Sequence, residues 1–266
     1  MNLEEYLALD ENEKPFDRMV TNGGFTGIFR TIGCIGDSLS SGEFESLDTE
    51  GKKGYHDYFD YSWGQYIARE AGCKVYNFSR GGMTAMEYCD SFALENDFWN
   101  PSLACQAYII ALGVNDLCYR HHEIGTTADI NLEDHTKNAP TFAGYYGRII
   151  SHLKEIQPKA RIFLMTMPKA PNEEHRKIQA AHAELLAEIA ALYEFTYVLD
   201  FHRYAPVYDG KFSKRFYLGG HMNPMGYMLT ARMVMSYIDY IIRHNPDDFK
   251  QVGFLGTPYH NISEKW

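Results

Sequence analysis

Short apolar runs alternate with longer amphipathic segments along most of the chain. The runs are rich in β-branched and aromatic residues and have the length of buried strands. The run at 104–112 is the most apolar of the first three and predicts a central strand that is buried on both faces. The expected strands are residues 31–35, 74–78, 104–112, 161–165 and 195–200.

The segments between these runs carry apolar residues three and four positions apart, which predicts amphipathic helices. The first of them stops at Gly72, a residue that commonly ends helices. Because strand and helix alternate, the strands should be parallel, with crossover helices on both faces of the sheet. The sequence therefore predicts an α/β fold, a three-layer α/β/α sandwich with about five parallel strands. The expected helices are residues 63–71, 84–92, 142–156, 173–193 and 224–243.

The α/β pattern is continuous from residue 30 to residue 245 and predicts one domain there. Residues 1–29, a short acidic segment of helical character followed by a glycine-rich stretch, are expected to form an N-terminal arm. Residues 246–266 are expected to form a C-terminal tail packed on the domain. A long polar and aromatic loop is expected after Ser38, through Tyr61. The polar excursion at 118–140 has the length of a lid or a binding loop.

Composition narrows the range of partners. The formal net charge of −10 disfavours nucleic acid and anionic membranes. The first residues carry acids where a signal peptide carries bases, and no apolar window reaches the roughly 18 residues of a membrane span. A cytoplasmic protein with a small-molecule partner is therefore expected. The five cysteines, an odd number, fit reduced thiols better than a disulfide framework.

The strand at 31–35 ends abruptly in Gly36, Asp37 and Ser38, which places a hydroxyl at the carboxyl edge of the sheet. A serine is a nucleophile only if a base takes its proton and fixed donors hold the oxyanion. His221 is the candidate base, since it lies in a glycine-rich loop just before the last helix. Asp37 and Asp116 are expected to bond to loop N–H groups and to take no catalytic step.

Four short motifs resemble the dispersed blocks of the GDSL, or SGNH, hydrolase family, and the resemblance covers about residues 30 to 243. It implies a flavodoxin-like SGNH hydrolase fold and an ester hydrolase in which Ser38 forms an acyl-enzyme and His221 is the base. No cofactor and no metal are implied. The motifs are Gly-Asp-Ser-Leu at 36–39, Asn-Phe-Ser-Arg-Gly-Gly at 77–82, Gly-Val-Asn-Asp at 113–116 and Gly-His-Met-Asn at 220–223.

The resemblance also implies three oxyanion donors. They are the backbone N–H of Ser38, the backbone N–H of a glycine in the second motif, and the side-chain amide of Asn115. The family's spacing, counted from Asn77, selects Gly82. Gly81 remains open as the donor, because the glycine pair could shift by one position.

One position departs from the family pattern. Leu218 stands where an aspartate usually orients the catalytic histidine. Three interpretations stay open: a backbone carbonyl holds the imidazole and the site is a Ser-His dyad, a carboxylate from Asp200 or Asp209 substitutes, or the protein is a catalytically weak or inactive binding protein.

A run of two histidines and a glutamate at 121–123, together with His135, raises the question of a metal site, but a solvated loop is the favoured interpretation.

The expected substrate is a small ester, with an acetyl group on a carbohydrate preferred. Thioesters, lipid esters and aryl esters remain open, because the family accepts all of them. Tyrosine clusters in loops that follow strands suit an acylated sugar or an aryl ester, although they suit ordinary packing as well. Flavin or nucleotide binding is disfavoured, since no glycine-rich phosphate loop follows the first strand.

Overall fold

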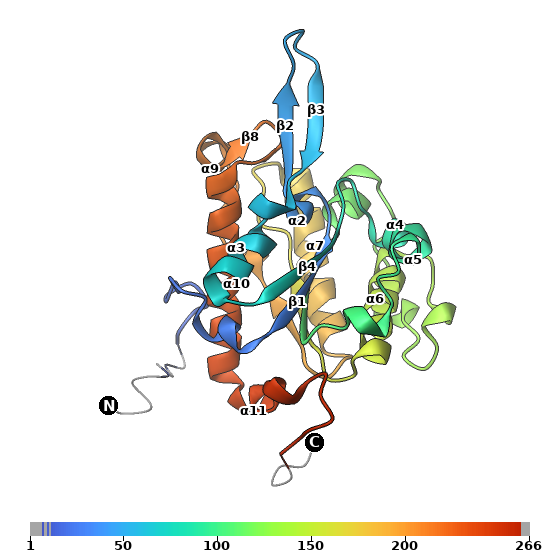
Figure 1. The fold of residues 1–266 in the computed structure, drawn as a ribbon. Coiled ribbons are helices and arrows are strands. Elements are labelled where there is room, and N and C mark those ends of the chain that lie inside the picture. Colours follow the sequence, from blue (N-terminus) through green and yellow to red (C-terminus); the bar gives the residue numbers. More distant parts are fainter. Residues whose placement is uncertain (1–6, 8–9, 11, 262–266) are drawn as a thin grey trace.

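The computed structural model describes residues 7, 10 and 12–261 (Figure 1). The short acidic helix expected at the N-terminus falls mainly on residues outside this part of the chain. Within it, the central sheet has five parallel strands in the order β4-β1-β5-β6-β7. The strands, in chain order, are β1 (Thr31–Gly36), β4 (Lys74–Ser79), β5 (Ala107–Ala111), β6 (Arg161–Met165) and β7 (Thr196–Leu199).

The middle strand β5 is shorter than the predicted run at 104–112. At its start, side chains take the backbone N–H groups that a longer strand would use: the Cys105 N–H donates to the Tyr108 hydroxyl at 2.8 Å and the Gln106 N–H donates to the Thr31 hydroxyl at 3.1 Å. Apolar character predicted the strand, whereas local side-chain bonds set where it begins.

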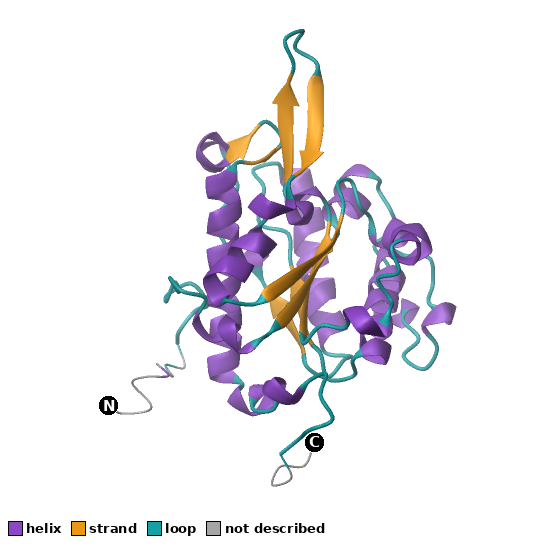
Figure 2. Cartoon of the chain, viewed as in Figure 1, coloured by secondary structure: helices purple, strands orange, loops and turns teal. Residues whose placement is uncertain are grey.

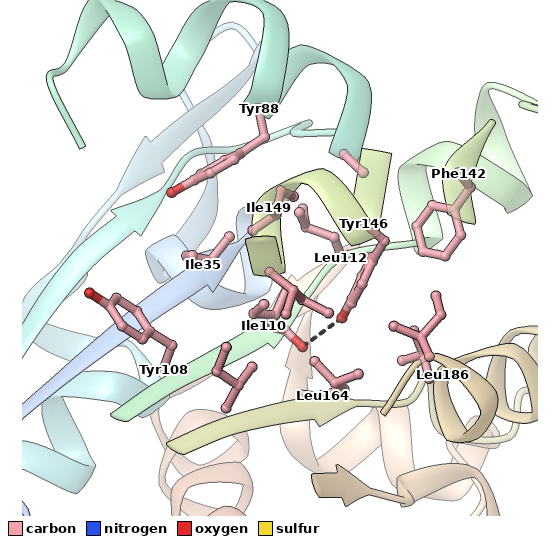
Figure 3. Close-up of a cluster of buried hydrophobic side chains, with 14 of the residues drawn as sticks. Ile35, Tyr88, Tyr108, Ile110, Leu112, Phe142, Tyr146, Ile149, Leu164 and Leu186 are labelled. Atoms are coloured by element: carbon pink, nitrogen blue, oxygen red, sulfur yellow. Dashed lines mark hydrogen bonds between the residues drawn. The ribbon is translucent and has the colours of Figure 1, made fainter. Parts of the chain in front are cut away.

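Each strand buries alternate residues on opposite faces of the sheet. On β1, Ile35 belongs to one core cluster, and Ile32 and Cys34 belong to the other. The first cluster lies under α6 (Phe142–Ile156) and α7 (Glu173–Ala190), where the Tyr146 hydroxyl donates to the Ile110 carbonyl at 3.1 Å (Figure 3). The second lies under α3 (Trp63–Ala71) and α10 (Pro224–His244). Figure 2 shows the sheet between these two helical layers, which confirms the three-layer sandwich.

The helix expected at 84–92 is interrupted. It consists of α4 (Ala85–Glu87), a wider π-helical turn η3 (Tyr88–Phe92) and α5 (Ala93–Glu95). Thr84 caps its start, because the Thr84 hydroxyl accepts from the Glu87 N–H at 3.1 Å. Within the turn, the Ser91 hydroxyl donates to the Glu87 carbonyl at 2.9 Å, a bond that competes with the regular helical ladder.

Two small antiparallel hairpins lie beyond the carboxyl edge of the central sheet. The longer, β2 (Glu43–Leu47) with β3 (Lys53–Asp57), projects from that edge in the segment expected to be a polar loop (Figures 1 and 2). The shorter pairs β8 (Tyr217–Leu218) with β9 (His221–Met222). Strands β2 and β9 contact each other, so segments far apart in sequence meet above the sheet.

Short helical segments complete the described part of the chain, and no helix in residues 7, 10 and 12–261 is long and apolar enough to cross a membrane. The last segments pack under the sheet, since Val252 and Leu255 belong to the second core cluster. The remaining segments are η1 (Gly24–Ile28), α2 (Ser38–Ser41), η2 (Phe59–Tyr61), η4 (Pro101–Leu103), η5 (Val114–Tyr119), η6 (Thr127–Asp129), η7 (His135–Lys137), α8 (Phe201–Tyr204), α9 (Gly210–Phe216), α11 (Pro246–Phe249) and η8 (Val252–Phe254).

Candidate active site

Ser38 is the first residue of α2, directly after β1 at the carboxyl edge of the sheet. The turn is tight, because a Cβ built on Gly36 would lie 2.1 Å from the Ser40 hydroxyl oxygen. Asp37 caps α2 by accepting from the Leu39 N–H at 3.0 Å. Asp37, Ser40 and Ser41 are buried while Ser38 is partly exposed, so Ser38 is the serine of this turn that solvent can reach.

His221 lies on β9, and β9 is in contact with α2, which begins at Ser38. Its imidazole has a carboxylate on each ring nitrogen: Nδ1 is 3.1 Å from Oε1 of Glu45, and Nε2 is 3.1 Å from Oε1 of Glu43. Oε1 of Glu45 also accepts from the Gly220 N–H at 2.6 Å. One carboxylate from β2 therefore holds both the imidazole and the backbone beside it.

Asp200 and Asp209, the two candidates for a substituting carboxylate, have other partners. Asp200 caps α8 by accepting from the Arg203 N–H at 2.9 Å, and Asp209 caps α9 by accepting from the Lys211 N–H at 2.9 Å. The sequence reasoning missed Glu45, because it read the segment after Ser38 as an irregular loop. The contact partner of Nδ1 is thus a carboxylate, and it comes from the hairpin.

The glycines of the second motif lie in different surroundings. Gly82 has a left-handed backbone with φ of +73°, and a Cβ built there would meet nothing within 4 Å. A Cβ on Gly81 would lie 1.9 Å from Oε2 of Glu43, so this glycine is required for the close approach of that carboxylate. The open space around Gly82 favours it over Gly81 as a donor to a bound molecule.

Asn115 joins the second and third motifs. Its side-chain amide donates to the carbonyl of Met83 at 3.1 Å and approaches Oδ2 of Asp37 at 3.5 Å. Asn115 is partly exposed at the carboxyl end of β5, next to the strand that leads into Ser38. The structure therefore brings elements of the first three motifs together at one edge of the sheet.

Asp37 and Asp116 bond to backbone N–H groups, as predicted, although these groups lie in the first turns of α2 and α4 and not in loops. Asp116 accepts from the Ala85 N–H at 2.9 Å, as Asp37 does from Leu39. Burial raises the pKa of Asp37 to about 7, against the hydrogen bond from Leu39. Burial likewise raises the pKa of Asp116 to about 6. Both carboxyl groups are buried beneath the site, where they hold the backbone at Leu39 and Ala85 in place.

The two glutamates on His221 differ in their ionisation. Burial raises the pKa of Glu43, and the nearby His221 opposes the effect. Burial alone would also raise the pKa of Glu45, but hydrogen bonds from Lys53, Gly220 and His221 lower it below its ordinary value. Glu45 is therefore the carboxylate that stays ionised, and Glu43 is the one that takes up a proton more readily.

A cavity of about 280 Å³ lies beside α2 at the carboxyl ends of β1, β5 and β6. Its wall is mostly apolar and aromatic and suits an apolar group. It includes Asp37 and Leu39 but not Ser38, Gly82, Asn115 or His221, so the cavity lies next to the candidate site. Its lining includes Leu39, Leu112, Val114, Tyr119, Met165, Met167, Pro168, Tyr208 and Tyr217.

The histidines of the polar excursion do not form one cluster. Nδ1 of His122 lies 3.5 Å from Oδ1 of Asp116, beneath the site. His135 lies against α6 instead, with its ring centroid 4.1 Å from that of His152. The group suggested by residues 121–123 with His135 is therefore not assembled.

The comparisons with known proteins agree with this fold. A model of the GDSL-like Lipase/Acylhydrolase family matches residues 34–229. No curated protein sequence matches this chain.

Solved structures that share the fold are distant in sequence. A family two carbohydrate esterase from Clostridium thermocellum, in complex with cellohexaose, has a TM-score of 0.56 and 16% identity, over 82% of this chain and 65% of that chain. A protein from Lactobacillus plantarum has a TM-score of 0.58 and 16% identity, over 80% and 97% of the two chains. A possible lipase from Chitinophaga pinensis has a TM-score of 0.51 and 16% identity, over 81% and 98%.

Proposed function

Because this chain belongs to the GDSL-like lipase/acylhydrolase family and is a carboxylic ester hydrolase, we propose that it works through a Ser38 acyl-enzyme with His221 as the base. The observation that carries the proposal is the contact of Glu45 with Nδ1 of His221, on a strand that lies beside α2. A carboxylate on Nδ1 leaves Nε2 as the nitrogen that exchanges protons with the serine.

The reaction begins when the Ser38 oxygen attacks the ester carbonyl and its proton passes to Nε2 of His221. The oxyanion is held by the N–H groups of Ser38 and Gly82 and by the amide of Asn115. The bond to the alcohol then breaks, and Nε2 returns the proton to the departing oxygen. Water next attacks the acyl-enzyme and gives a proton to Nε2 of His221. The bond between the acyl carbon and the Ser38 oxygen then breaks, His221 returns the proton to that oxygen, and the acid leaves.

Glu45 acts in this scheme as a positioning residue. By accepting from the Nδ1–H it fixes the tautomer and ring orientation of His221 and stabilises the imidazolium that forms during attack. Its second bond, from the Gly220 N–H, anchors the same loop. The proposal of an inactive binding protein rested on Leu218, and a carboxylate from another segment removes that motivation.

Glu43 occupies the place on Nε2 that the serine needs. Its Oε1 lies 3.1 Å from this nitrogen in the structure. Attack by Ser38 therefore requires the Glu43 side chain to turn away, and a substrate that fills the space beside Gly81 would displace it.

The proposed substrate is a small acyl ester of a carbohydrate. Tyr55 on β3 is exposed and lies edge-on to the His221 ring, with ring centroids 6.0 Å apart. Tyr58 and Tyr61 are exposed on the same side of the hairpin base. Exposed aromatic faces beside a nucleophile suit the apolar faces of a sugar ring. The distant structure that holds cellohexaose shares the fold and makes acetylated sugars the first substrates to test.

The test is a panel of acetylated sugars and short-chain aryl esters, assayed with the wild type, Ser38→Ala and His221→Ala. We expect a burst and turnover with p-nitrophenyl acetate, and fluorophosphonate labelling that Ser38→Ala abolishes. Ser102→Ala, which changes an exposed serine away from the site, serves as the control. Full activity or labelling in Ser38→Ala would refute the mechanism. If the wild type is labelled but hydrolyses none of the acetylated sugars, the proposed substrate class is refuted.

A further inference from the structure

A second cluster of ligating side chains lies at the opposite edge of the sheet from Ser38. His152 and Glu155 stand near the C-terminal end of α6, and His135 comes from η7 in the polar excursion. Nε2 of His135 lies 3.2 Å from Oε1 of Glu155, and Nδ1 of His152 lies 3.5 Å from Oε2 of Glu155. One ligating atom from each of the three residues falls within 4.8 Å of the others.

We propose that His135, His152 and Glu155 form a binding site for a divalent transition metal ion, with zinc as the preferred ion. Two imidazoles and one carboxylate are a common ligand set for zinc. With bonds of about 2.0 to 2.1 Å, neighbouring ligand atoms of a tetrahedral zinc ion lie roughly 3.3 Å apart. The two separations to Glu155, 3.2 and 3.5 Å, are near this length but involve different carboxylate oxygens, so closing the site requires the carboxylate to turn and the two rings to move together.

The ligands are held in place before any ion binds. His152 and Glu155 are three residues apart on one helix and so point to the same side. The Trp99 indole stacks on the His152 ring, with centroids 4.5 Å apart and planes 17° apart. His135 follows Asp134, which caps η7 by accepting from the Thr136 N–H at 3.1 Å. The side chains of His135 and His152 are 11% and 23% exposed, so both rings are largely packed into the protein.

The cluster also has room for a fourth ligand. A groove of about 410 Å³ runs past His135 and Glu155, and the Glu155 side chain is 60% exposed at its rim. Two cations on the same helix have other partners: the Lys154 ammonium donates to the carbonyls of Ala160 and Glu194, and the Arg148 guanidinium donates to Asp90 at 3.0 Å. Water can therefore complete a four-coordinate site from the groove.

Metal binding here would join the polar excursion to α6. The start of α6 already bonds to the excursion through the backbone, since the N–H groups of Phe142 and Ala143 donate to the carbonyls of Glu123 and Ile124. With one ligand from the excursion and two from the helix, the ion would add a second link, near the C-terminal end of α6. Since the site lies at the amino edge of the sheet, the ion would stabilise the fold and leave the chemistry at Ser38 unchanged.

The test uses the untagged full-length protein, freed of metal with a chelator, and Zn²⁺ alone as the probe. Titration against a chromophoric chelator should give one zinc ion per chain, thermal unfolding should shift to higher temperature, and Co²⁺ should quench the fluorescence of Trp99. His135→Ala and Glu155→Gln should each weaken zinc binding at least tenfold. His260→Ala, which removes an exposed histidine elsewhere, should bind as the wild type does.

Glu155→Gln keeps the proposal falsifiable, because Glu155 is largely exposed and the amide preserves its size. Its circular dichroism and its metal-free unfolding temperature should match those of the wild type. Absence of stoichiometric zinc in the wild type, or unchanged affinity in both variants, would overturn the proposal.

Discussion

At the scale of single residues, His221 is defined by what its two nitrogens contact. Glu45 on Nδ1 is bonded to Lys53 and Gly220 as well, so its carboxylate is fixed and stays charged. Glu43 on Nε2 is the weaker acid of the two. Glu45 is thus suited to orient the imidazole through Nδ1, and Glu43 is suited to leave Nε2 when the substrate binds. A general base requires one fixed nitrogen and one nitrogen that is free to take a proton.

Glu45→Gln tests the orienting role. The amide can donate to Nδ1 as well as accept from it, so the ring loses its fixed tautomer, and kcat for p-nitrophenyl acetate should fall by about 10²- to 10⁴-fold. KM should change little, since Glu45 does not contact the substrate in the proposed mechanism. Steady-state kinetics give both values, and Glu50→Gln, on the exposed turn of the same hairpin, is the control. Wild-type kcat in Glu45→Gln would remove Glu45 from the mechanism.

Asn115→Ala tests the proposed oxyanion donor. Loss of one such donor should lower kcat by about 10²- to 10³-fold, while KM stays close to its wild-type value. The amide also donates to the Met83 carbonyl, so thermal unfolding must be measured on the same sample. If the variant unfolds at a lower temperature and its KM changes while kcat is preserved, Asn115 only holds the loop together.

At the scale of elements, the β2-β3 hairpin is the part that the site depends on most. It supplies both carboxylates on His221, and it is fixed at its base by Phe44, whose ring packs against Tyr58, Tyr61 and Tyr227 at centroid distances of 6.3, 5.9 and 5.5 Å. The Tyr227 hydroxyl also donates to the Glu43 carbonyl at 2.6 Å. Through these contacts α10 determines where the carboxylates lie.

Phe44→Ala should therefore reduce both stability and activity. Loss of a partly buried aromatic ring should lower the free energy of unfolding by about 2 kcal/mol. Because β2 would then be free to shift, kcat should fall as well, although Phe44 contacts no reacting atom. Urea unfolding and esterase kinetics measure the two effects. Leu47→Ala, at a position 69% exposed on the same strand, should change neither. Equal kinetics in the two variants would argue against positioning by the hairpin base.

The hairpin is also where sequence reasoning failed. Glu43 and Glu45 flank Phe44, and a period of two places them on one face of a strand. This alternation is short and lies in a polar segment, so it was read as a loop. The partner of Glu45 is 176 residues away, and nothing near Leu218 indicates which distant acid replaces the usual aspartate. A hairpin pattern at 43–57 would have placed Glu43 and Glu45 on the same face, but it would not have shown that His221 is their partner.

At the scale of the whole molecule, the central sheet was predictable because its three middle strands, β1, β5 and β6, are buried along almost their whole length. Runs as apolar as 107–110 and 161–165 are stable only in the core, and the alternation of the strands with amphipathic helices sets the parallel order. Gly82 and Asn115 were expected from the family resemblance, and the strand order explains why they lie at the same edge as Ser38, since each stands just past the carboxyl end of a strand. The division into an arm, a domain and a tail stays a prediction.

The buried acids under the site couple the stability of the molecule to pH. Burial raises the pKa of Asp37 from 3.8 to about 7. Between these two values the unfolded chain has released the proton and the folded chain still holds it, so unfolding releases a proton. The folded state is therefore favoured most below the unfolded pKa. That advantage is lost as the pH rises toward 7, by up to roughly 4 kcal/mol.

Asp37→Asn should remove this dependence. The asparagine keeps a carbonyl oxygen that can accept from the Leu39 N–H, so the cap on α2 survives while the ionisable group is gone. We expect the free energy of unfolding, measured by urea titration between pH 4 and pH 8, to fall less steeply with pH in the variant than in the wild type. Asp209→Asn, which changes the cap of α9, should keep the wild-type slope. Parallel slopes in the wild type and Asp37→Asn would show that Asp37 is ionised in the folded protein, and the carboxylate would then have to be balanced by the donors around it, Asn115 among them.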